Sequence, residues 1–236
     1  DAMKQYNKKQ DEIASDRYEN RPVQKYYEGV SMTAIWAVKS LGIDPATGYE
    51  IFLNKDGKRT SSWSAADMVI CGDELPDFSG NFGFNWTWKG LSLNCVFRYQ
   101  FGGQMYNQTL VDKVENADMK YNVDRRIYTD RWRKPGDIAL YKAISEEVYV
   151  SEKQQFASEK TYPTSRFVQK RNELKISSLQ LSYDFFRHDF VKKIGLERIL
   201  LRFNANDLFT FSSIDIERGT SYPFARTFNF SLNVTL

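Results

Sequence analysis

The chain has 236 residues, of which 42% are hydrophobic and 15% aromatic, a content that excludes an intrinsically disordered protein. Its 33 basic and 30 acidic residues leave a net charge of +3, which gives no reason to expect nucleic acid or an anionic membrane surface as a partner. Cys71 and Cys95 are too few for a disulfide scaffold or a four-ligand zinc site, and we interpret both as unpaired.

The first 27 residues are polar and charged without a sustained period, and they predict loop with a short helix near residues 10–17. Two short strands follow on either side of the turn signal "DPATG" at residues 44–48. Asp44, Asn54 and Asp56 offer oxygen ligands for calcium, but their spacing is not that of an EF-hand. We therefore interpret residues 44–48 as a structural turn.

The clearest pattern is a β-hairpin at residues 80–101. Apolar side chains alternate with small polar ones from Phe82 to Trp88, and the alternation resumes from Leu91 to Phe101 after Lys89-Gly90. This predicts two strands of about ten residues joined by a two-residue turn.

Residues 104–170 carry many charges and no clean period, which predicts a long connection with local structure of its own. Alternation returns at residues 173–185, where a change of parity at Ser177-Ser178 predicts a β-bulge. After a connector at residues 187–195, residues 196–207 alternate again. The closing "RTFNFSLNVTL" alternates to its last residue.

Three features favour an all-β transmembrane barrel. The polar strand faces are mainly Asn, Ser, Thr, Gly and Gln instead of Lys and Glu, as in a polar lumen. The strands approach the ~9–11 residues that cross a bilayer, and short connections alternate with long ones. The alternative is a soluble β-sandwich, such as a surface carbohydrate-binding module, whose strands also bury one face.

The strand directions follow from the connections. Residues 80–88, 173–185 and 225–236 are predicted to run toward the periplasm, and residues 91–101 and 196–207 away from it. Five strands are too few to close a barrel, since bacterial single-chain barrels start at about eight. We therefore expect the C-terminal part of a larger barrel: residues 1–79 mainly extracellular loop with short strands, 80–101 a hairpin, 102–172 a long extracellular loop, and 173–236 the last three strands.

Six blocks, in order, resemble the C-terminal part of SusC/RagA-type TonB-dependent outer-membrane transporters. They are "LGIDPATGYEIFLNKDG", "PDFSGNFGFNWTWKGLSLNCVFRYQFGGQMYN", "RWRKPGD", "LKISSLQLSYDF", "LRFNANDLFTFS" and "YPFARTFNFSLNVTL". The resemblance covers nearly everything after about Tyr27. It departs from the family at the last residue, which is commonly Phe and is Leu236 here.

The resemblance implies a 22-stranded antiparallel barrel in the outer membrane of a Gram-negative bacterium, with a plug domain outside this chain. It also implies energy from TonB, through a segment outside this chain, and a SusD-like surface lipoprotein that closes over the substrate. The substrate class it implies is an oligosaccharide or oligopeptide, with no cofactor. Outer-membrane lipid and the remainder of the barrel and plug are the other expected partners.

Four aromatic residues of the predicted outer segments are candidates for stacking on a substrate: Trp63, Tyr106, Trp132 and Tyr141. The arginine-rich stretch around Trp132 is interpreted as loop scaffolding. Five residues of the closing strand are predicted to face lipid: Phe228, Phe230, Leu232, Val234 and Leu236. The only histidine, His188, lies in a predicted periplasmic turn without a catalytic partner, so we predict no catalytic site, no metal site and no enzyme activity.

Overall fold

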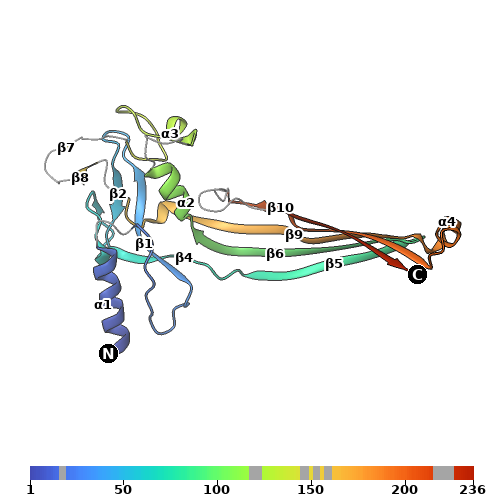
Figure 1. Cartoon of the computed structure of the whole chain (residues 1–236). Coiled ribbons are helices and arrows are strands. Elements are labelled where there is room, and N and C mark those ends of the chain that lie inside the picture. The colour runs from blue at the N-terminus through green and yellow to red at the C-terminus, as the bar shows by residue number, and fades with distance from the viewer. Residues whose placement is uncertain (16–19, 117–123, 144–148, 151–154, 157–160, 215–225) are drawn as a thin grey trace. The chain divides into compact units, whose positions relative to one another are not determined.

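The computed structural model describes residues 1–236 except 16–19, 117–123, 144–148, 151–154, 157–160 and 215–225 (Figure 1). The chain divides into two compact units. The first, which we call the loop unit, comprises Asp1–Leu75 and Gly103–Lys170. The second, the strand unit, comprises Pro76–Gly102 and Arg171–Leu236.

The first part of the loop unit is a helix and a small antiparallel sheet. Its elements are α1 (Ala2–Ala14), β1 (Ala34–Ile43), β2 (Glu50–Leu53), β3 (Arg59–Thr60), the 3-10 turn η1 (Ala65–Asp67) and β4 (Met68–Asp73). The sheet order is β3-β2-β1-β4, so β1 is an inner strand with β2 and β4 as neighbours. This is why five consecutive residues of β1, from Ala34 to Val38, are buried.

The first helix begins earlier than predicted: α1 covers Ala2–Ala14, so it overlaps the predicted range 10–17 only at residues 10–14, and residues 16 and 17 lie outside the described residues. Tertiary contacts explain the difference. The Asn7 amide donates to the Tyr26 carbonyl at 2.7 Å and accepts from the Tyr26 N–H at 3.0 Å, and the Tyr6 ring packs 5.4 Å from the Tyr26 ring. These contacts stabilise an early helix that the local sequence does not signal.

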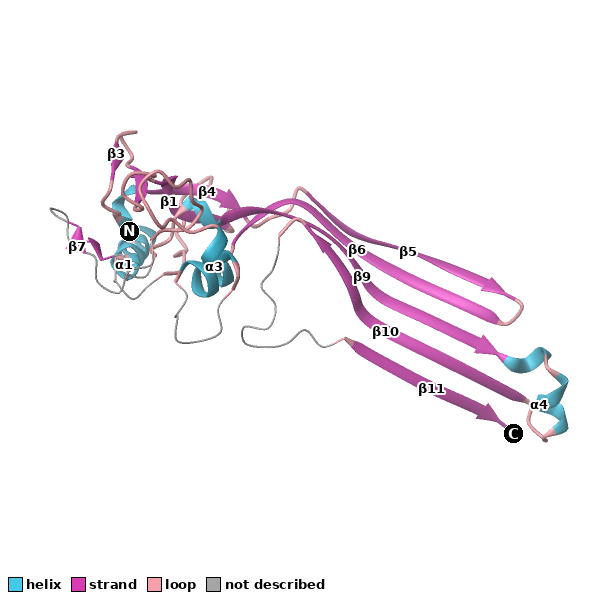
Figure 2. Ribbon diagram, turned by 90° about the horizontal axis from the view of Figure 1, so that it is seen from above, coloured by secondary structure: helices cyan, strands magenta, loops and turns pink. Residues whose placement is uncertain are grey.

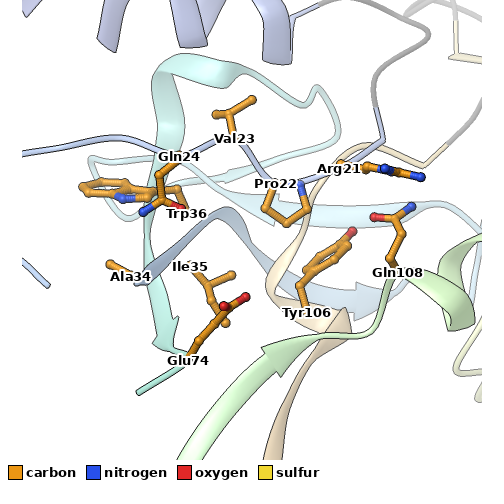
Figure 3. A pocket seen from close by; sticks show the side chains of 10 residues that line it. All are labelled: Arg21, Pro22, Val23, Gln24, Ala34, Ile35, Trp36, Glu74, Tyr106 and Gln108. Carbon is orange, nitrogen blue, oxygen red and sulfur yellow. The ribbon is translucent and has the colours of Figure 1, made fainter. Parts of the chain in front are cut away.

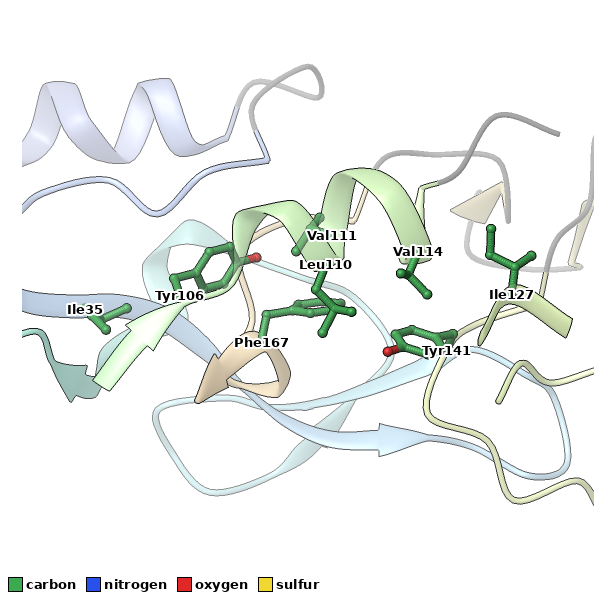
Figure 4. Packing of buried hydrophobic residues seen from close by; sticks show 8 residues of the cluster. All are labelled: Ile35, Tyr106, Leu110, Val111, Val114, Ile127, Tyr141 and Phe167. Carbon is green, nitrogen blue, oxygen red and sulfur yellow. The ribbon is translucent and has the colours of Figure 1, made fainter. Parts of the chain in front are cut away.

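The second part of the loop unit is built from short helices around an apolar core. Its elements are α2 (Gln108–Leu110), the π-helix η2 (Val111–Glu115), α3 (Arg126–Thr129), β7 (Tyr149–Val150), β8 (Gln155–Phe156) and the 3-10 turn η3 (Ser165–Phe167). One cluster, shown in Figure 4, joins Ile35, Tyr106, Leu110, Val111, Val114, Ile127, Tyr141 and Phe167. A second joins Ala14, Val23, Val38, Phe52, Ala65 and Met68. In the described part of the chain, no helix is long and apolar enough to span a membrane.

The strand unit is one antiparallel sheet of long strands, in the order β11-β10-β9-β6-β5 (Figure 2). Its strands are β5 (Phe78–Trp88), β6 (Leu91–Tyr106), β9 (Val168–Asp184), β10 (Arg198–Ser212) and β11 (Thr227–Thr235). The last residues of β6, from Gly103, and the first of β9, up to Lys170, belong to the loop unit. The 3-10 turn η4 (Phe185–Arg187) and the helix α4 (Asp189–Lys193) connect β9 to β10. Strands β5 and β11 are the two edges of the sheet.

The predicted two-residue turn between β5 and β6 is confirmed. Lys89 and Gly90 have φ values of 47° and 92°, the pair of positive values that a tight hairpin turn needs. Glycine is required at the second position for another reason as well. A Cβ on Gly90 would lie 2.6 Å from the carbonyl oxygen of Asp184, at the end of β9.

The pairing of β9 with β10 does shift register next to Ser177-Ser178, where a bulge was predicted. The extra residue, however, lies in β10 and not in β9. There Asp207 and Leu208 together lie opposite Ser177, and Asp207 has φ of 56°. The shift places Ile176 opposite Phe209. In β9 the apolar residues change from even to odd positions at Ser177-Ser178. Without the register shift, the apolar residues of β10 would therefore lie opposite polar residues of β9.

Residues directly opposite in the sheet form rows that are either apolar or polar. One row consists of Leu181, Phe203 and Phe230, and the next consists of Gln180, Asn204 and Asn229. The hairpin repeats this, since Trp86 lies opposite Leu93 and Asn85 opposite Asn94. Because opposite residues share a face and neighbours alternate, the sheet has one apolar and one polar face over these rows.

Candidate functional site

A cavity of about 440 Å³ lies within the loop unit (Figure 3). Residues 21–24, which follow α1, form one wall. The remaining lining residues are Ala34, Ile35 and Trp36 of β1, and Glu74, Tyr106 and Gln108. The cavity therefore draws on four stretches of chain that the sheet and α2 bring together.

Three side chains of this cavity, those of Gln108, Trp36 and Tyr106, have buried polar atoms without a hydrogen-bond partner in the described part of the chain. The Gln108 amide nitrogen donates to Asn20 at 3.2 Å and to Asp112 at 2.9 Å, while its Oε1 is buried and unpartnered within the described residues. The indole Nε1 of Trp36 is likewise buried and unpartnered there. The walls of the cavity thus contain a donor on Trp36, an acceptor on Gln108 and the Tyr106 hydroxyl, none of which has a partner among the described residues.

Packing fixes the Trp36 ring. Tyr27 lies with its ring centre 5.1 Å from that of Trp36, and Lys25 Nζ lies 5.7 Å from the ring centre. Tyr106, which also lines the cavity, is only 8% exposed and packs edge-on against Phe167 at 6.0 Å. Burial raises the pKa of Tyr106 far above its ordinary value, so its phenol stays neutral.

A buried ion cluster joins distant segments of the loop unit. Arg166 donates to Glu50 from Nε at 3.2 Å and from Nη2 at 2.9 Å. It donates to Glu115 from Nη2 at 2.6 Å and from Nη1 at 3.2 Å. Nη1 also donates to the Leu140 carbonyl at 2.6 Å. One guanidinium therefore connects β2, the π-helix η2 and the connection after α3.

Arg131 adds a second tie to the same region. Its side chain, 6% exposed, donates to the carbonyl oxygens of Lys142 at 2.8 Å and Glu115 at 3.0 Å. Burial lowers the pKa of Arg131, and the charge of Glu115 opposes that shift. The interpretation of this arginine-rich stretch as loop scaffolding is confirmed for Arg131.

Trp132 packs on the turn at residues 44–48. Its Nε1 donates to the Pro45 carbonyl at 2.8 Å, and a Cβ on Gly48 would lie 2.5 Å from its ring. The Asp44 carboxylate accepts from the Ala46 N–H at 3.1 Å and the Thr47 hydroxyl at 2.7 Å, as in an Asx-type turn.

Among the described residues, no group of His, Cys, Asp and Glu side chains has the arrangement of a metal site.

The four predicted substrate-stacking residues do not form one cluster. Tyr106 lines the cavity and shares the first apolar core with Tyr141, which is 5% exposed. Trp63 packs beside the second core, stacks on Tyr162 at 4.4 Å and donates to the Pro163 carbonyl at 3.1 Å. Trp132 lies on the turn described above. Only Tyr106 of the four lines the cavity.

Sequence reasoning missed Trp36, Gln108 and the Arg166 cluster. One signal was present for the cluster: Glu50 stands directly before the apolar "IFL" of a short strand, a position where a carboxylate needs a buried cation. No such signal existed for the cavity. Trp36 lies in a continuous apolar run, which indicates burial and nothing about an open space beside it.

Comparisons with known proteins agree on one family, although no family model matches the chain. The chain is 28% identical over 155 residues to TonB-dependent receptor P39 of Formosa agariphila, covering 64% of the chain and 14% of that receptor. It is 25% identical over 229 residues to TonB-dependent receptor P3 of the same organism, covering 88% of the chain and 21% of that receptor.

Two solved structures, of the RagAB peptide importer in its closed-closed and open-open states, share the fold. Their TM-scores are 0.58 and 0.56 at 19% identity, over 77% and 82% of this chain and 20% and 22% of theirs. The chain is thus similar in sequence to TonB-dependent receptors and shares its fold with the RagAB importer. Its long antiparallel strands have the fold of a large β-barrel, as predicted from the sequence.

The chain spans only 14% and 21% of the lengths of the two Formosa receptors. Its relatives are named as receptors and an importer, not as enzymes.

Within the strand unit, the His188 side chain forms a hydrogen bond with the Tyr183 hydroxyl at 2.6 Å. Cys95 is buried and Cys71 partly buried, and both are free thiols.

Proposed function

We propose that this chain supplies closing strands and outer loops of a transporter that imports a bulky nutrient across the outer membrane of a Gram-negative bacterium. The barrel has 22 strands, and TonB supplies energy through a segment outside this chain. A SusD-like surface lipoprotein closes over the substrate, which is an oligosaccharide or an oligopeptide. The sequence similarity to TonB-dependent receptors supports this role, and so do the apolar rows of the strand unit.

The observation that carries the proposal is an apolar sheet face that is exposed. Phe230 is 76% exposed, Leu232 62% and Phe82 53%, although each lies opposite another apolar residue in the next strand. Lipid is the solvent that such a face meets without penalty. We therefore assign Phe228, Phe230, Leu232, Val234 and Leu236 of the closing strand to the lipid face.

The same exposure argues against the soluble β-sandwich. In a sandwich, a second sheet covers the apolar face of the first, and side chains such as Phe230 are buried. Strand lengths point the same way, because β5 has 11 residues and β10 has 15, far above the usual ~5–6.

In this proposal the five long strands cross the membrane and the two long connections lie outside the cell. The loop unit is made of those connections, which supports residues 1–79 and 102–172 as extracellular segments. Strands β5 and β11, the two edges of this sheet, would pair with further strands of the barrel.

Within the loop unit, we assign substrate contact to the cavity that Tyr106 lines. The unpartnered polar groups of its walls, on Trp36, Gln108 and Tyr106, suit the hydroxyls of a sugar or the amides of a peptide equally well. Trp63, Trp132 and Tyr141 contact protein groups, and their part in substrate binding stays a prediction.

The test uses the whole receptor in its own organism. A strain lacking the receptor gene is supplied with single oligosaccharides or oligopeptides as the growth-limiting nutrient, and uptake is measured with and without the gene on a plasmid. We expect one substrate class to depend on the gene, and a surface lipoprotein to co-purify with the tagged receptor from outer membranes. Recovery of the receptor in the soluble fraction, or uptake of every nutrient without it, contradicts the proposal.

A further inference from the structure

The connection between β9 and β10, residues 185–197, is folded instead of being a bare turn. The His188 N–H donates to the Phe185 carbonyl at 2.9 Å, and the Leu196 N–H donates to the Val191 carbonyl at 3.1 Å. Val191 is 1% exposed and fills the inside of the connection. A defined surface therefore projects from this end of the sheet.

An aromatic cluster fixes the connection to the apolar face of the sheet. Tyr183 lies opposite Leu201, on the apolar rows, and the Phe185 ring packs against it at 4.6 Å. Phe190 then packs on Phe185 at 5.9 Å, and His188 on Tyr183 at 5.7 Å. The connection thus continues the apolar face beyond the end of the strands.

Three apolar side chains of the connection are exposed. Phe186 is 49% exposed, Phe190 46% and Ile194 59%. Phe190 and Ile194 are four residues apart at the end of α4, so they lie on one side of it. Soluble turns do not usually present two phenylalanines and an isoleucine to water within nine residues.

Basic side chains surround this apolar surface. The connection has three exposed basic side chains without a carboxylate partner in the described part of the chain: Arg187, Lys192 and Lys193. It contains two acidic residues, Asp189 and Glu197. Arg198, by contrast, is paired with Asp184. Exposed aromatic and aliphatic groups beside free cations are the combination that binds the interface of an anionic bilayer.

The neighbouring turn has the same character. The Asp184 N–H donates to the Gly90 carbonyl at 2.9 Å, which joins the β9–β10 connection to the hairpin turn. Beside that turn, Trp88 is 56% exposed and Lys89 Nζ lies 5.0 Å from its ring centre. The apolar and basic groups of the connection are therefore part of a longer band at this end of the sheet.

We propose that residues 185–197 form an interfacial anchor that binds the periplasmic leaflet of the outer membrane. Phe186, Phe190 and Ile194 enter the boundary between headgroups and acyl chains, and Arg187, Lys192 and Lys193 bind lipid phosphates. The anchor holds this end of β9 and β10 at a fixed depth. This inference rests on the proposed function for the placement of the strands in the bilayer.

The test places a nitroxide label on single cysteines of the full-length receptor, otherwise cysteine-free, in vesicles of phosphatidylethanolamine and phosphatidylglycerol. Labels at Phe190→Cys and Ile194→Cys are expected to collide often with oxygen and rarely with a water-soluble nickel chelate. A label at Asp189→Cys, one residue away, is the matched control and is expected to meet the chelate freely. Equal chelate access at positions 189 and 190 overturns the anchor, and protection of position 190 from both reagents assigns it to a protein contact instead.

A second arm tests the role of charge. The double variant Lys192→Glu/Lys193→Glu is expected to increase chelate access at position 194 in the anionic vesicles and to change little in phosphatidylcholine vesicles. The same access in both lipids, with and without the charge reversal, overturns phosphate binding. A label at Phe230→Cys reports separately on the sheet: if it meets lipid while position 190 does not, the anchor fails and the barrel assignment stands. Heat-modifiable migration on gels shows that each variant is folded.

Discussion

Arg166 binds Glu115 through two hydrogen bonds, of 2.6 and 3.2 Å, although the two residues are 51 positions apart. Glu115 is 2% exposed, and its Oε1 also accepts from the Thr161 hydroxyl at 3.2 Å. Replacing Arg166 by Met leaves two buried carboxylates, those of Glu50 and Glu115, without their cation. We expect a loss of about 3–5 kcal/mol in the stability of the loop unit.

Limited proteolysis of the full-length receptor in detergent measures this loss, because opening of the loop unit exposes residues 103–170 to cleavage. Arg126→Met is the matched control. Arg126 pairs with Asp124 at 2.9 Å, but both side chains are about 30% exposed, so the expected cost is below about 1 kcal/mol. Equal cleavage rates in the two variants would show that the Arg166 cluster does not stabilise the loops.

The same pair predicts an acid dependence. Burial raises the pKa of Glu115, but the charge and hydrogen bonds of Arg166 outweigh burial and hold that pKa below its ordinary value of 4.5. A carboxylate whose folded-state pKa is lowered stabilises the fold above its ordinary pKa, and this contribution is lost as the pH falls through the folded-state pKa. The loop unit should therefore lose stability in acid.

Thermal unfolding of the wild type and of Glu115→Gln, from about pH 7 to about pH 3, tests this dependence. Glutamine resembles the protonated carboxyl group and does not titrate. We expect the wild type to be more stable at neutral pH, and the difference to shrink below about pH 4.5. A difference that stays constant across the range contradicts the role given to Glu115.

Alanine substitutions at two glycines distinguish the effect of backbone strain from the effect of a clash with the Trp132 ring. Gly48 and Gly57 both have φ of 76°, so alanine at either position costs about 1–2 kcal/mol of backbone strain. A Cβ on Gly48 meets the Trp132 ring at 2.5 Å, whereas a Cβ on Gly57 meets nothing within 4 Å. Gly48→Ala should therefore lower the Tm of the receptor further than Gly57→Ala. Equal Tm values would mean that Trp132 does not rest on the turn.

The long strands could be predicted from the sequence because alternation reports directly on a two-faced sheet. The Lys89-Gly90 turn is likewise a local feature, because glycine readily takes the positive φ that the second turn position needs. The bulge was placed in the wrong strand because a parity change in one strand does not say which strand carries the extra residue. In the structure, Asp207 takes the unusual backbone conformation and Ser177 does not.

The interior of the loop unit could not be predicted in this way. Its contacts join residues far apart in sequence, such as Arg166 with Glu50, which are separated by 116 positions. Short helices such as α2, with three residues, leave no periodic signal. The cavity depends on these same non-local contacts, which is why Tyr106 was found as an aromatic residue and Trp36 and Gln108 were not found at all.

Trp36→Phe tests the cavity as a substrate site. The change keeps an aromatic ring beside Lys25 and Tyr27 and removes the buried indole N–H together with one ring of the indole. If substrate accepts a hydrogen bond from that N–H, affinity should fall by about 0.5–1.5 kcal/mol, and the smaller buried ring should also lower stability. Isothermal titration of the full-length receptor with its nutrient measures the affinity.

Trp63→Phe is the control for that measurement. The Trp63 indole already donates to the Pro163 carbonyl at 3.1 Å, so its loss should lower stability and leave affinity unchanged. An unchanged affinity in Trp36→Phe would exclude a hydrogen bond from the Trp36 indole to substrate. A fall in affinity in both variants would indicate a general effect on the loops.

Neighbouring residues of the closing strand test the lipid face. Phe230 lies in the apolar row with Phe203, and Asn229 lies in the polar row with Asn204. Phe230→Arg places a charge in hydrocarbon, at a cost of about 2–4 kcal/mol if the residue lies near the bilayer midplane, and assembly of the receptor in outer membranes should fall. Asn229→Arg carries the same charge on the lumen side and should assemble normally, as judged by heat-modifiable migration and by surface labelling of cells. A defect in Asn229→Arg without one in Phe230→Arg would reverse the assignment of the two faces, because the alternation in β11 fixes them as a pair.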